Sequence, residues 1–248
     1  MLAEERQARI LDMARESGSV TTADLMEKLN ASESTIRRDL EMLDQQRLLT
    51  RVHGGATVGN LVLHDQTPAS KMGQNAPAKA AIARFARDLI QPDDFVYVDG
   101  GSTTLALVEI LAQPEATFVT DSLPIAQALL AKRCTVHLLG GSVKPLTEVV
   151  VGSSTLEALS RLNFTLGFFG TNGATLEQGF TTPEYEEARV KDLALHRCIR
   201  PFVLCDSSKF GQISPVTFAG FDEATIITEA LPHDARYGQV DNIVKAEG

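Results

Sequence analysis

Residues 32–43 have the sequence SESTIRRDLEML, in which apolar side chains recur at the spacing of one helix face. Ile36, Leu40 and Leu43 stand at i, i+4 and i+7, so an α-helix, which turns by about 100° per residue, places them in one stripe. Ser32 is a favourable N-cap for that helix. The polar side presents hydroxyl and guanidinium groups near the amino-terminal end, from Ser34, Thr35, Arg37 and Arg38. The stretch therefore predicts an amphipathic helix with one buried face and one face available to a partner.

The sequence on either side of this helix predicts two further helices and a hairpin. Residues 4–17 and a segment ending near Leu29 each carry apolar side chains on one helical face, and Thr21 or Thr22 can cap the second of these helices. After the third helix, the β-prone residues 48–56 are interrupted by two glycines, which suit a tight turn. This order is typical of a winged helix-turn-helix, in which the third helix meets base edges and the hairpin contacts phosphate or the minor groove.

We therefore predict a DNA-binding surface on the third helix and the hairpin. Its residues carry hydroxyl, guanidinium or imidazole groups that can contact bases or phosphate: Ser32, Ser34, Thr35, Arg37, Arg38, Arg51 and His53. Taken alone, the helix could equally carry a solvated basic turn, and His53 could be an ordinary surface histidine. The 23 basic and 32 acidic residues give a net charge of −9, which repels nucleic acid overall. DNA binding must therefore come from this local patch.

Composition places the chain among ordinary globular proteins. Its 248 residues suggest one or two domains, and 44% hydrophobic with 22% charged residues argues against a disordered or disulfide-scaffold chain. We find no apolar run of the roughly 18 to 20 residues that a membrane span requires, and the amino terminus is charged, so we expect a cytoplasmic protein without a membrane partner. The three cysteines lack metal-ligand spacing and are expected to be inert buried thiols: Cys134, Cys198 and Cys205.

Residues 77–230 alternate between β-prone and helical patterns. The apolar β-rich runs are 95–98, 117–119, 135–139, 166–169, 201–205 and 224–228, and helical periodicity covers 82–89, 105–111, 124–130, 155–162 and 186–198. This alternation predicts an α/β domain with a mostly parallel sheet and helices on both faces. The residues before position 77 contain glycine and proline and show no sustained apolar periodicity, which indicates a linker. We divide the chain into a winged helix-turn-helix domain at 1–57, a linker at 58–76, the α/β domain at 77–230 and a tail at 231–248.

Small polar residues follow the predicted strands of the α/β domain. Because ligands bind in open α/β sheets beyond the carboxyl ends of the strands, these loops predict a pocket rich in amide donors and hydroxyls. The first loop, DGGSTT at 99–104, leads into a helix whose amino terminus favours an anion such as phosphate. It is neither a Walker loop nor a dinucleotide fingerprint. The predicted pocket residues are Asp99, Gly100, Gly101, Ser102, Thr103, Thr104, Thr120, Ser122, Gly141, Lys144, Asn172, Gly173, Glu187, Asp206 and Lys209.

Three segments near the amino terminus resemble the winged helix-turn-helix of the DeoR family of bacterial transcriptional regulators: EERQARIL at 4–11, SESTIRRDLEML at 32–43 and RVHGGA at 51–56. From about residue 79 to 228 the chain resembles that family's sensor domain, which is similar to the phosphosugar-binding fold of ribose-5-phosphate isomerase and glucosamine-6-phosphate deaminase. Within the family, residues 168–188 and 206–228 are most similar to the repressors of fructose operons. The resemblance implies a repressor that a phosphorylated sugar, fructose 1-phosphate, releases from operator DNA.

Two positions depart from that family's pattern. Its Gly-Thr-Thr phosphate loop has the form GSTT at 101–104 here, and its Thr-Asn-Ser has become TDS at 120–122. A carboxylate at Asp121 could repel phosphate if it pointed inward. We therefore leave Asp121 out of the predicted pocket.

Other functions stay open on the residues alone. Acid and base groups at Asp99, Glu187, Asp206 and Lys209 could serve a sugar-phosphate isomerase or deaminase, although an enzyme has no evident use for a helix-turn-helix. Segment 99–104 could also be a plain glycine-rich turn with capping threonines. An activator of the same architecture that responds to another phosphosugar shares every feature. We expect a regulator that is not an enzyme, without a cofactor or metal, bound to a palindromic operator as a homodimer or homotetramer.

Overall fold

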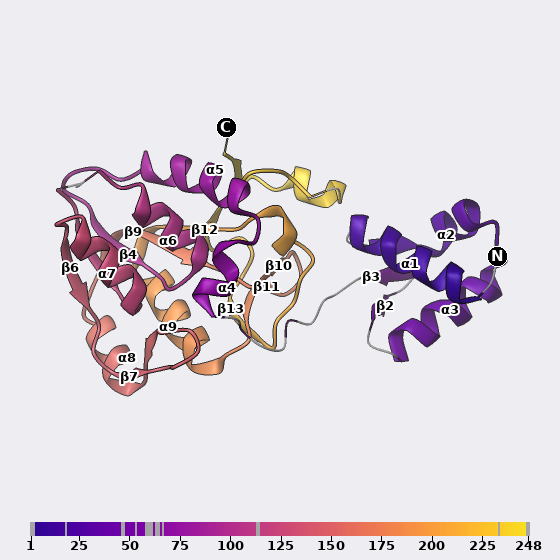
Figure 1. Cartoon of the computed structure of the whole chain (residues 1–248), viewed down its shortest axis with the longest axis horizontal. Coiled ribbons are helices and arrows are strands. Elements are labelled where there is room, and N and C mark those ends of the chain that lie inside the picture. The colour runs from indigo at the N-terminus through magenta and orange to yellow at the C-terminus, as the bar shows by residue number, and fades with distance from the viewer. Residues whose placement is uncertain are drawn as a thin grey trace.

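The computed structural model describes residues 3–17, 19–45, 48–52, 54–57, 62, 65, 67–112, 115–232 and 234–246. Its elements form two groups, one amino-terminal and one that contains the rest of the described chain (Figure 1). The buried hydrophobic residues divide in the same way, with one cluster between Ile10 and Ala56 and two clusters between Ile82 and Ala246. Each group is therefore built around a core of its own.

The amino-terminal group is a winged helix-turn-helix, as predicted. Its elements are α1 (Ala3–Ser17), β1 (Ser19–Thr21), α2 (Thr22–Leu29), α3 (Glu33–Gln45), β2 (Thr50–Val52) and β3 (Gly55–Thr57). The strands pair antiparallel in the order β1-β3-β2, so the predicted hairpin is present and gains β1, a strand too short to show an alternating pattern. A Cβ on Gly55 would lie 2.1 Å from the carbonyl oxygen of Val20. Only glycine lets β3 approach β1 this closely.

Local contacts define the turn between α2 and α3. Thr21 caps α2, because its Oγ1 accepts a hydrogen bond from the backbone N–H of Asp24 at 3.0 Å. Asn30 ends the helix with a φ of 47°, in the left-handed region that asparagine tolerates better than most residues. The predicted apolar stripe of α3 is buried in the core of this group. The polar side of α3 consequently faces outward.

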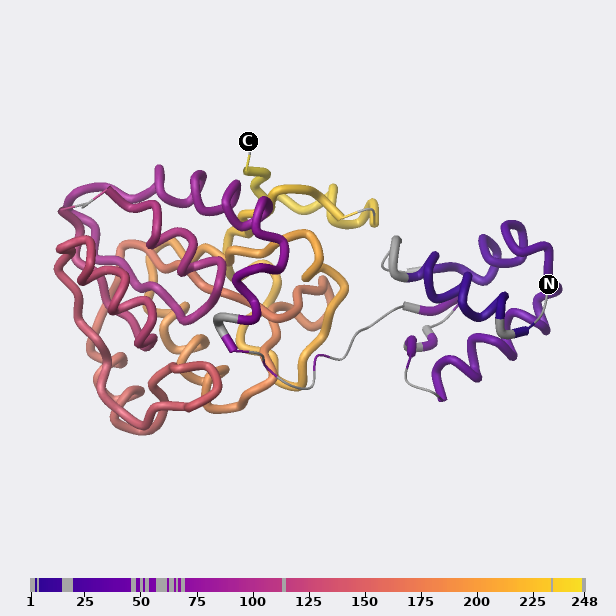
Figure 2. Tube along the Cα trace, viewed as in Figure 1, coloured from indigo at the N-terminus to yellow at the C-terminus, as the bar shows by residue number. Residues whose placement is uncertain are grey.

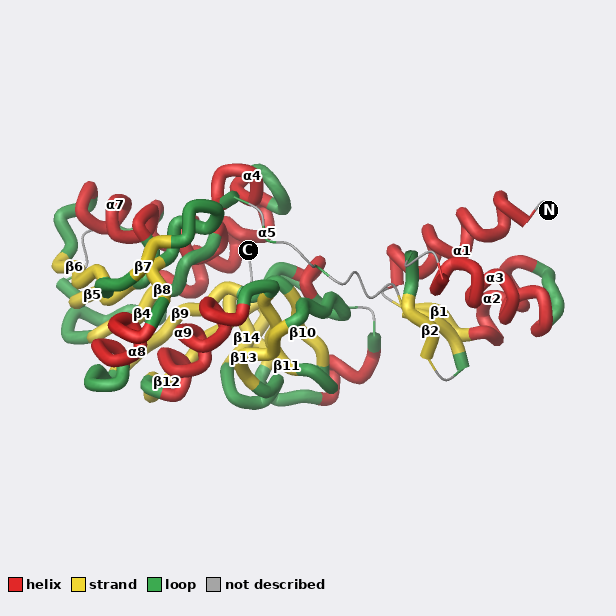
Figure 3. Tube along the Cα trace, turned by 90° about the horizontal axis from the view of Figure 1, so that it is seen from below, coloured by secondary structure: helices red, strands yellow, loops and turns green. Residues whose placement is uncertain are grey.

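The second group is built on a seven-stranded parallel sheet (Figure 3). The strand order is β15-β14-β12-β9-β4-β5-β6, and all neighbours pair in parallel. The strands are β4 (Phe95–Val98), β5 (Thr117–Thr120), β6 (Thr135–Leu138), β9 (Phe164–Gly170), β12 (Cys198–Leu204), β14 (Thr225–Thr228) and β15 (Ile243–Lys245). The predicted mostly parallel α/β architecture is confirmed.

Helices cover both faces of this sheet. On one face lie α5 (Ala76–Arg87), α6 (Ser102–Glu109) and α7 (Leu123–Ala131). On the other lie α8 (Ser153–Leu159), α9 (Tyr185–His196) and a small antiparallel sheet of β10 (Gly173–Thr175), β11 (Gly179–Thr182) and β13 (Val216–Ala219). Strand β4 shows why both faces need cover: Val96 and Val98 pack on the first face and Tyr97 on the second.

The structure adds elements that the sequence pattern does not indicate. Besides the small sheet, these are α4 (Pro68–Met72), β7 (Ser142–Val143), β8 (Val150–Val151) and the 3₁₀ turns at Ser207–Lys209 and Ala235–Gln239. Helix α4 lies in the predicted linker, and β15 lies in the predicted tail. Ala246 is buried with Ile82 in one cluster, and this end of the described chain lies beside α5 (Figure 2). Segments on both sides of 77–230 thus pack onto that region.

Candidate functional site

The start of α3 gathers the hydroxyls of the predicted DNA-binding surface. Ser32 Oγ lies 3.0 Å from Ser34 Oγ and 2.8 Å from Thr35 Oγ1, and it accepts a 3.3 Å hydrogen bond from the backbone N–H of Thr35. Ser32 is thus a helix cap as well as a surface hydroxyl. Ser34 and Arg38 are exposed, and Thr35 is half-buried. The structure therefore brings these predicted residues to one end of one exposed helix face.

Two of the predicted arginines already have internal contacts. Arg37 forms an ion pair with Glu33, one turn earlier, at 2.6 Å, with side chains 66% and 54% exposed. A pair so exposed contributes little to stability, so Arg37 can exchange Glu33 for another anion at low cost. Arg51 is exposed on β2, where its backbone N–H donates to Asp44 Oδ1 at 3.3 Å. His53 lies outside the described residues.

The large sheet changes its winding direction between β4 and β9. From β4 the chain proceeds to β5 and β6 on one side, whereas β9 returns to the other side of β4, with β12, β14 and β15 following outward. At such a point the loops that leave the two central strands diverge and open a crevice at their carboxyl ends. A cavity lies there, and Gly100 and Gly101 line it from β4, with Gly170 and Thr171 from β9.

The cavity collects polar residues from segments far apart in the sequence. Eight predicted pocket residues line it: Gly100, Gly101, Ser102, Thr103, Asn172, Glu187, Asp206 and Lys209. The lining residues that we did not predict are Asp65, Lys71, Gln74, Asn75, Lys79, Thr147, Val149, Gly170, Thr171, Lys191 and Leu204. Among these described lining residues, four lysines accompany three carboxylates. The cavity therefore suits an anionic ligand.

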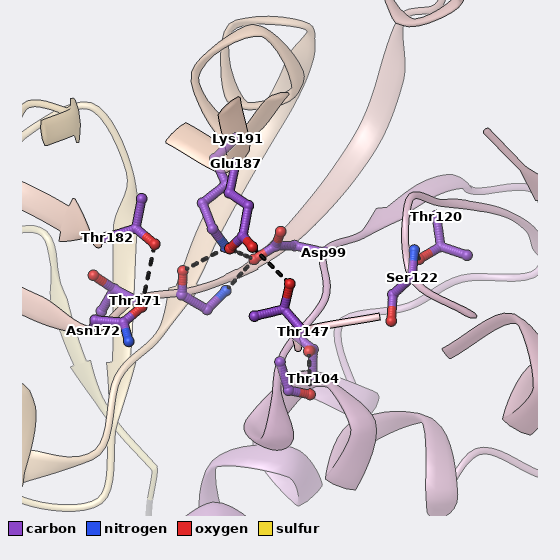
Figure 4. A network of polar contacts seen from close by, with 12 residues as sticks. Asp99, Thr104, Thr120, Ser122, Thr147, Thr171, Asn172, Thr182, Glu187 and Lys191 are labelled. Carbon is purple, nitrogen blue, oxygen red and sulfur yellow. Dashed lines mark hydrogen bonds and ion pairs between the residues drawn. The ribbon is translucent and has the colours of Figure 1, made fainter. Parts of the chain in front are cut away.

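Seven predicted pocket residues do not line the cavity: Asp99, Thr104, Thr120, Ser122, Gly141, Lys144 and Gly173. Several of their polar groups are used within the fold. Thr104 Oγ1 donates to the carbonyl oxygen of Gly101 at 2.9 Å, and Thr120 Oγ1 accepts from the backbone N–H of Ser122 at 3.0 Å. Figure 4 shows Thr120 and Ser122 to the side of the central network.

The other members of that set have structural explanations as well. Lys144 is paired with Glu184 at 2.6 Å and with Glu186 at 3.5 Å. The glycines allow close packing, because a Cβ on Gly141 would lie 2.2 Å from Thr155 Oγ1, and one on Gly173 would lie 2.2 Å from a backbone oxygen. Loops at the same sheet edge thus serve two purposes, and only some of them reach the cavity.

Asp99 forms a buried ion pair with Lys191 beside the cavity (Figure 4). The two side chains are 2% and 7% exposed. Asp99 Oδ2 also accepts from the backbone N–H of Gly170 at 2.8 Å, and Lys191 Nζ donates to the Gly170 carbonyl at 3.3 Å. Glu187, one turn before Lys191 on α9, accepts from Thr147 Oγ1 at 2.7 Å. This network joins the ends of β4 and β9 to α9 and fixes the wall of the cavity.

Burial and neighbouring charges shift the pKa values of this network. Burial lowers the pKa of Lys191, but the charge of Asp99 and its hydrogen bond to Lys191 outweigh burial, and the pKa is raised overall. Burial also raises the pKa of Glu187. Burial, reinforced by the charge of Asp99, raises the pKa of Asp121 to about 8. Asp121 does not line the cavity, and at neutral pH its carboxyl is mostly protonated, so it presents little charge to a ligand.

Lys191 is a residue that sequence reasoning missed although the sequence contains a signal for it. It stands four residues after Glu187 in a helix where Ala188, Val190 and Ala194 are all buried. A lysine among buried positions requires a carboxylate partner. The lining residues from 65–79 gave no comparable signal, because their place at the cavity depends on how α4 packs.

Chemically, the cavity offers what an anion requires. The first turn of α6 brings backbone N–H groups and the side chains of Ser102 and Thr103, and the lysines add positive charge. No group of three histidine, cysteine or acidic side chains in the described part of the chain is placed to hold a metal ion. No helix within the described ranges has the length and apolar character to cross a membrane.

Comparisons with known proteins agree with these two groups of elements. Residues 6–60 match the DeoR-like helix-turn-helix domain, and residues 74–230 match the DeoR C terminal sensor domain. The chain is 39% identical over 229 residues to the uncharacterized HTH-type transcriptional regulator FruR of Bacillus subtilis, covering 92% of this chain and 91% of that one. It is 34% identical over 213 residues to the lactose phosphotransferase system repressor of Staphylococcus epidermidis, covering 84% of each.

Among solved structures, ribose 5-phosphate isomerase A from Methanocaldococcus jannaschii overlaps 55% of this chain and 55% of its own, with a TM-score of 0.42 and 12% identity. That overlap is too slight to bear on function. The sensor-domain match, in contrast, covers more than half of the chain, and the Bacillus regulator is similar along nearly its whole length. The chain therefore belongs to the DeoR family of transcriptional regulators.

Proposed function

We propose that the protein represses a sugar-utilisation operon and that a phosphorylated sugar releases it from operator DNA. The observation that carries the proposal is the cavity at the β4–β9 crevice, with its lysines and the amino terminus of α6. A relative at 34% identity is named a repressor of a lactose phosphotransferase system, which supports a role in sugar control. The family resemblance of residues 168–188 and 206–228 favours fructose as the sugar and fructose 1-phosphate as the effector.

Electrostatics favour a phosphorylated sugar over a free one. The hydroxyls of Ser102 and Thr103, the helix amino terminus and Lys209 all favour a dianion, and each charge-assisted hydrogen bond contributes about 1.5 to 3 kcal/mol. Free fructose forgoes these contacts. An operon controlled in this way would be expressed only after its sugar had entered the cell and been phosphorylated.

On the DNA side, we propose that α3 enters the major groove. Ser34, Arg37 and Arg38 would face base edges, and Arg51 on the wing would contact the backbone. The protein would bind as a homodimer or homotetramer, because a palindromic operator presents its half-sites to symmetric subunits.

A gel-shift titration on DNA upstream of the neighbouring operon tests both parts. Fructose 1-phosphate, fructose 6-phosphate, tagatose 6-phosphate and fructose are compared as effectors. We expect fructose 1-phosphate to release the DNA and fructose to leave it bound. Equal release by fructose would refute the phosphate site, whereas a preference for another ester would overturn only the choice of fructose 1-phosphate.

Two variants locate the effector site. Thr103→Ala and Lys209→Ala should weaken sensing while leaving operator affinity unchanged, which gives a repressor that cannot be induced. Lys245→Ala, which removes an exposed lysine from β15, is the matched control.

Coupling between the two sites should weaken DNA binding by about 1 to 3 kcal/mol when effector is bound, and operator DNA should weaken effector binding by the same factor. Identical calorimetric affinities with and without operator would contradict this coupling.

A further inference from the structure

The cavity is too small in this structure for the ligand that its chemistry suits. Its volume is about 70 Å³, whereas small-molecule sites typically measure roughly 300 to 1,000 Å³. Asp65 is one of the residues that line the cavity, and its side chain is 6% exposed. Asp65 lies between the region that matches the helix-turn-helix and the region that matches the sensor domain. A carboxylate from the connecting segment thus lies in a cavity lined by lysines.

Asp65 is held by groups that also suit a phosphate. Its carboxylate forms an ion pair with Lys71, and Asn172 Nδ2 donates to the same oxygen, Oδ1, at 3.4 Å. Lys79 in turn donates from its Nζ to the carbonyl oxygen of Lys71, which joins α4 to α5. Lys71, Lys79 and Asn172 all line the cavity. The carboxylate therefore occupies the side of the cavity where cationic and amide donors meet.

A backbone hydrogen bond fixes the same segment a few residues earlier. The N–H of Val62 donates to the carbonyl oxygen of Ile213 at 3.0 Å. Only residues 58–61 separate Val62 from β3, the last strand of the wing. Each residue of an extended chain spans at most about 3.6 Å, so the position of Val62 limits how far the wing can lie from the sensor.

We propose that Asp65 is an internal anion that occupies part of the effector's phosphate site and that a bound sugar phosphate displaces it. This inference rests on the proposed function, and it specifies how the effector would act on the DNA-binding module. A phosphate dianion carries more charge and more acceptor oxygens than a carboxylate, so it prevails at Lys71 and Asn172. Displacement of Asp65 breaks its contacts with Lys71 and Asn172 and weakens the nearby attachment at Val62, so the wing is held less closely to the sensor.

The first measurement is ligand affinity in the full-length protein. Asp65→Asn keeps the size of the side chain and removes its charge, and Asp93→Asn, at an exposed position, is the matched control. Calorimetry with fructose 1-phosphate and with inorganic phosphate should show binding to Asp65→Asn that is about threefold to tenfold tighter than to wild type, because no internal anion competes. Asp93→Asn should match wild type. Weaker or unchanged binding to Asp65→Asn would overturn the proposal, and weaker binding would make Asp65 a direct ligand of the sugar.

The second measurement is amide hydrogen exchange in the peptide covering residues 62–72. Exchange there should be faster in unliganded Asp65→Asn than in wild type, and fructose 1-phosphate should accelerate it in wild type. Lys71→Gln, which removes the partner instead of the carboxylate, should also accelerate exchange but should weaken phosphate binding. Slower exchange on ligand binding would contradict displacement.

The third measurement separates this inference from the proposed function. The ratio of operator affinities without and with fructose 1-phosphate should fall toward one in Asp65→Asn. If no sugar phosphate binds wild type, the proposed effector class is wrong, yet inorganic phosphate and hydrogen exchange still decide whether Asp65 is displaced by an anion. If sugar phosphates bind and release DNA equally in wild type and Asp65→Asn, the proposed function stands and the role of Asp65 is refuted.

Discussion

Arg37 on the recognition helix and Lys191 beside the cavity show two uses of a cation in one chain. Arg37 and its partner Glu33 are 66% and 54% exposed, whereas Lys191 and Asp99 are 7% and 2% exposed. Water screens the first pair, so exchanging partners costs little. The second pair is removed from water, so the loss of either member leaves the other charge buried without a partner. The helix surface can therefore adapt to an external partner, and the buried pair holds the cavity wall in place.

Removing Lys191 should have the largest effect. Lys191→Met leaves the charge of Asp99 buried without its ion pair, so the free energy of unfolding should fall by about 3 to 5 kcal/mol. Urea denaturation at pH 7 measures this. Arg161→Met is the control, because Arg161 forms an exposed pair with Glu157 at 2.7 Å and should change stability by no more than about 0.5 kcal/mol. Equal losses of unfolding free energy in the two variants would show that the buried pair contributes no more to stability than the exposed pair.

Removing Arg37 should weaken operator binding without destabilising the fold. Arg37→Ala should reduce affinity by about 1 to 3 kcal/mol and alter sequence preference if the guanidinium contacts a base. Arg161→Ala matches it closely, since Arg161 also pairs with an acid one turn earlier, and it should leave operator affinity within error. Titrations on the specific operator and on mutated operators measure both the affinity and the sequence preference. A loss equal on all sequences would indicate a phosphate contact, and no loss would remove α3 from the interface.

The same contrast explains how much of the molecule the sequence predicts. Helix α3 is local: its stripe of Ile36, Leu40 and Leu43 is buried, and Ser34, Arg37 and Arg38 are exposed, as the 3.6-residue period requires. The parallel sheet was equally predictable, because each of its strands before β15 is a β-prone run and helical patterns separate the first five of these runs. These features depend only on neighbours in the chain.

The cavity depends on contacts that no local pattern specifies. Loops after parallel strands meet at one edge, which predicted Ser102 and Asn172. Thr120 and Ser122 lie at the end of a strand at the same edge, but they do not line the cavity. The sequence cannot distinguish these loops, since the distinction arises from where the sheet reverses its winding. Asp65 is a still more remote case, because α4 must fold onto the sensor before the segment around it can reach the cavity.

Asp121 tests whether burial controls charge in this region. Its pKa in the folded protein, about 8, is above the ordinary value of 3.8, because burial disfavours the carboxylate. The protonated form is thus favoured by folding, so its contribution to stability is complete below pH 3.8 and is lost as the pH rises through 8. Asp121→Asn cannot ionise, so its free energy of unfolding relative to wild type should rise by at least about 1 kcal/mol between pH 5 and pH 9. Thermal unfolding at both pH values measures the difference, and a gap that does not change with pH would show that Asp121 ionises freely.

The exposed pair on α3 provides the smallest effect and the sharpest test of adaptability. Glu33 lies 2.6 Å from Arg37 and competes with DNA for its guanidinium. Glu33→Gln should leave the free energy of unfolding within about 0.5 kcal/mol of wild type, as expected for an exposed i,i+4 pair. Operator affinity should rise, because Arg37 no longer gives up an internal partner and one negative charge is removed from the DNA-facing side; about twofold to fivefold is the scale for a pair of this strength. Glu157→Gln, its counterpart in the Arg161 pair, should not change operator affinity. A decrease in affinity for Glu33→Gln would mean that the ion pair orients Arg37 for binding, so that even this exposed side chain is held in place by the fold.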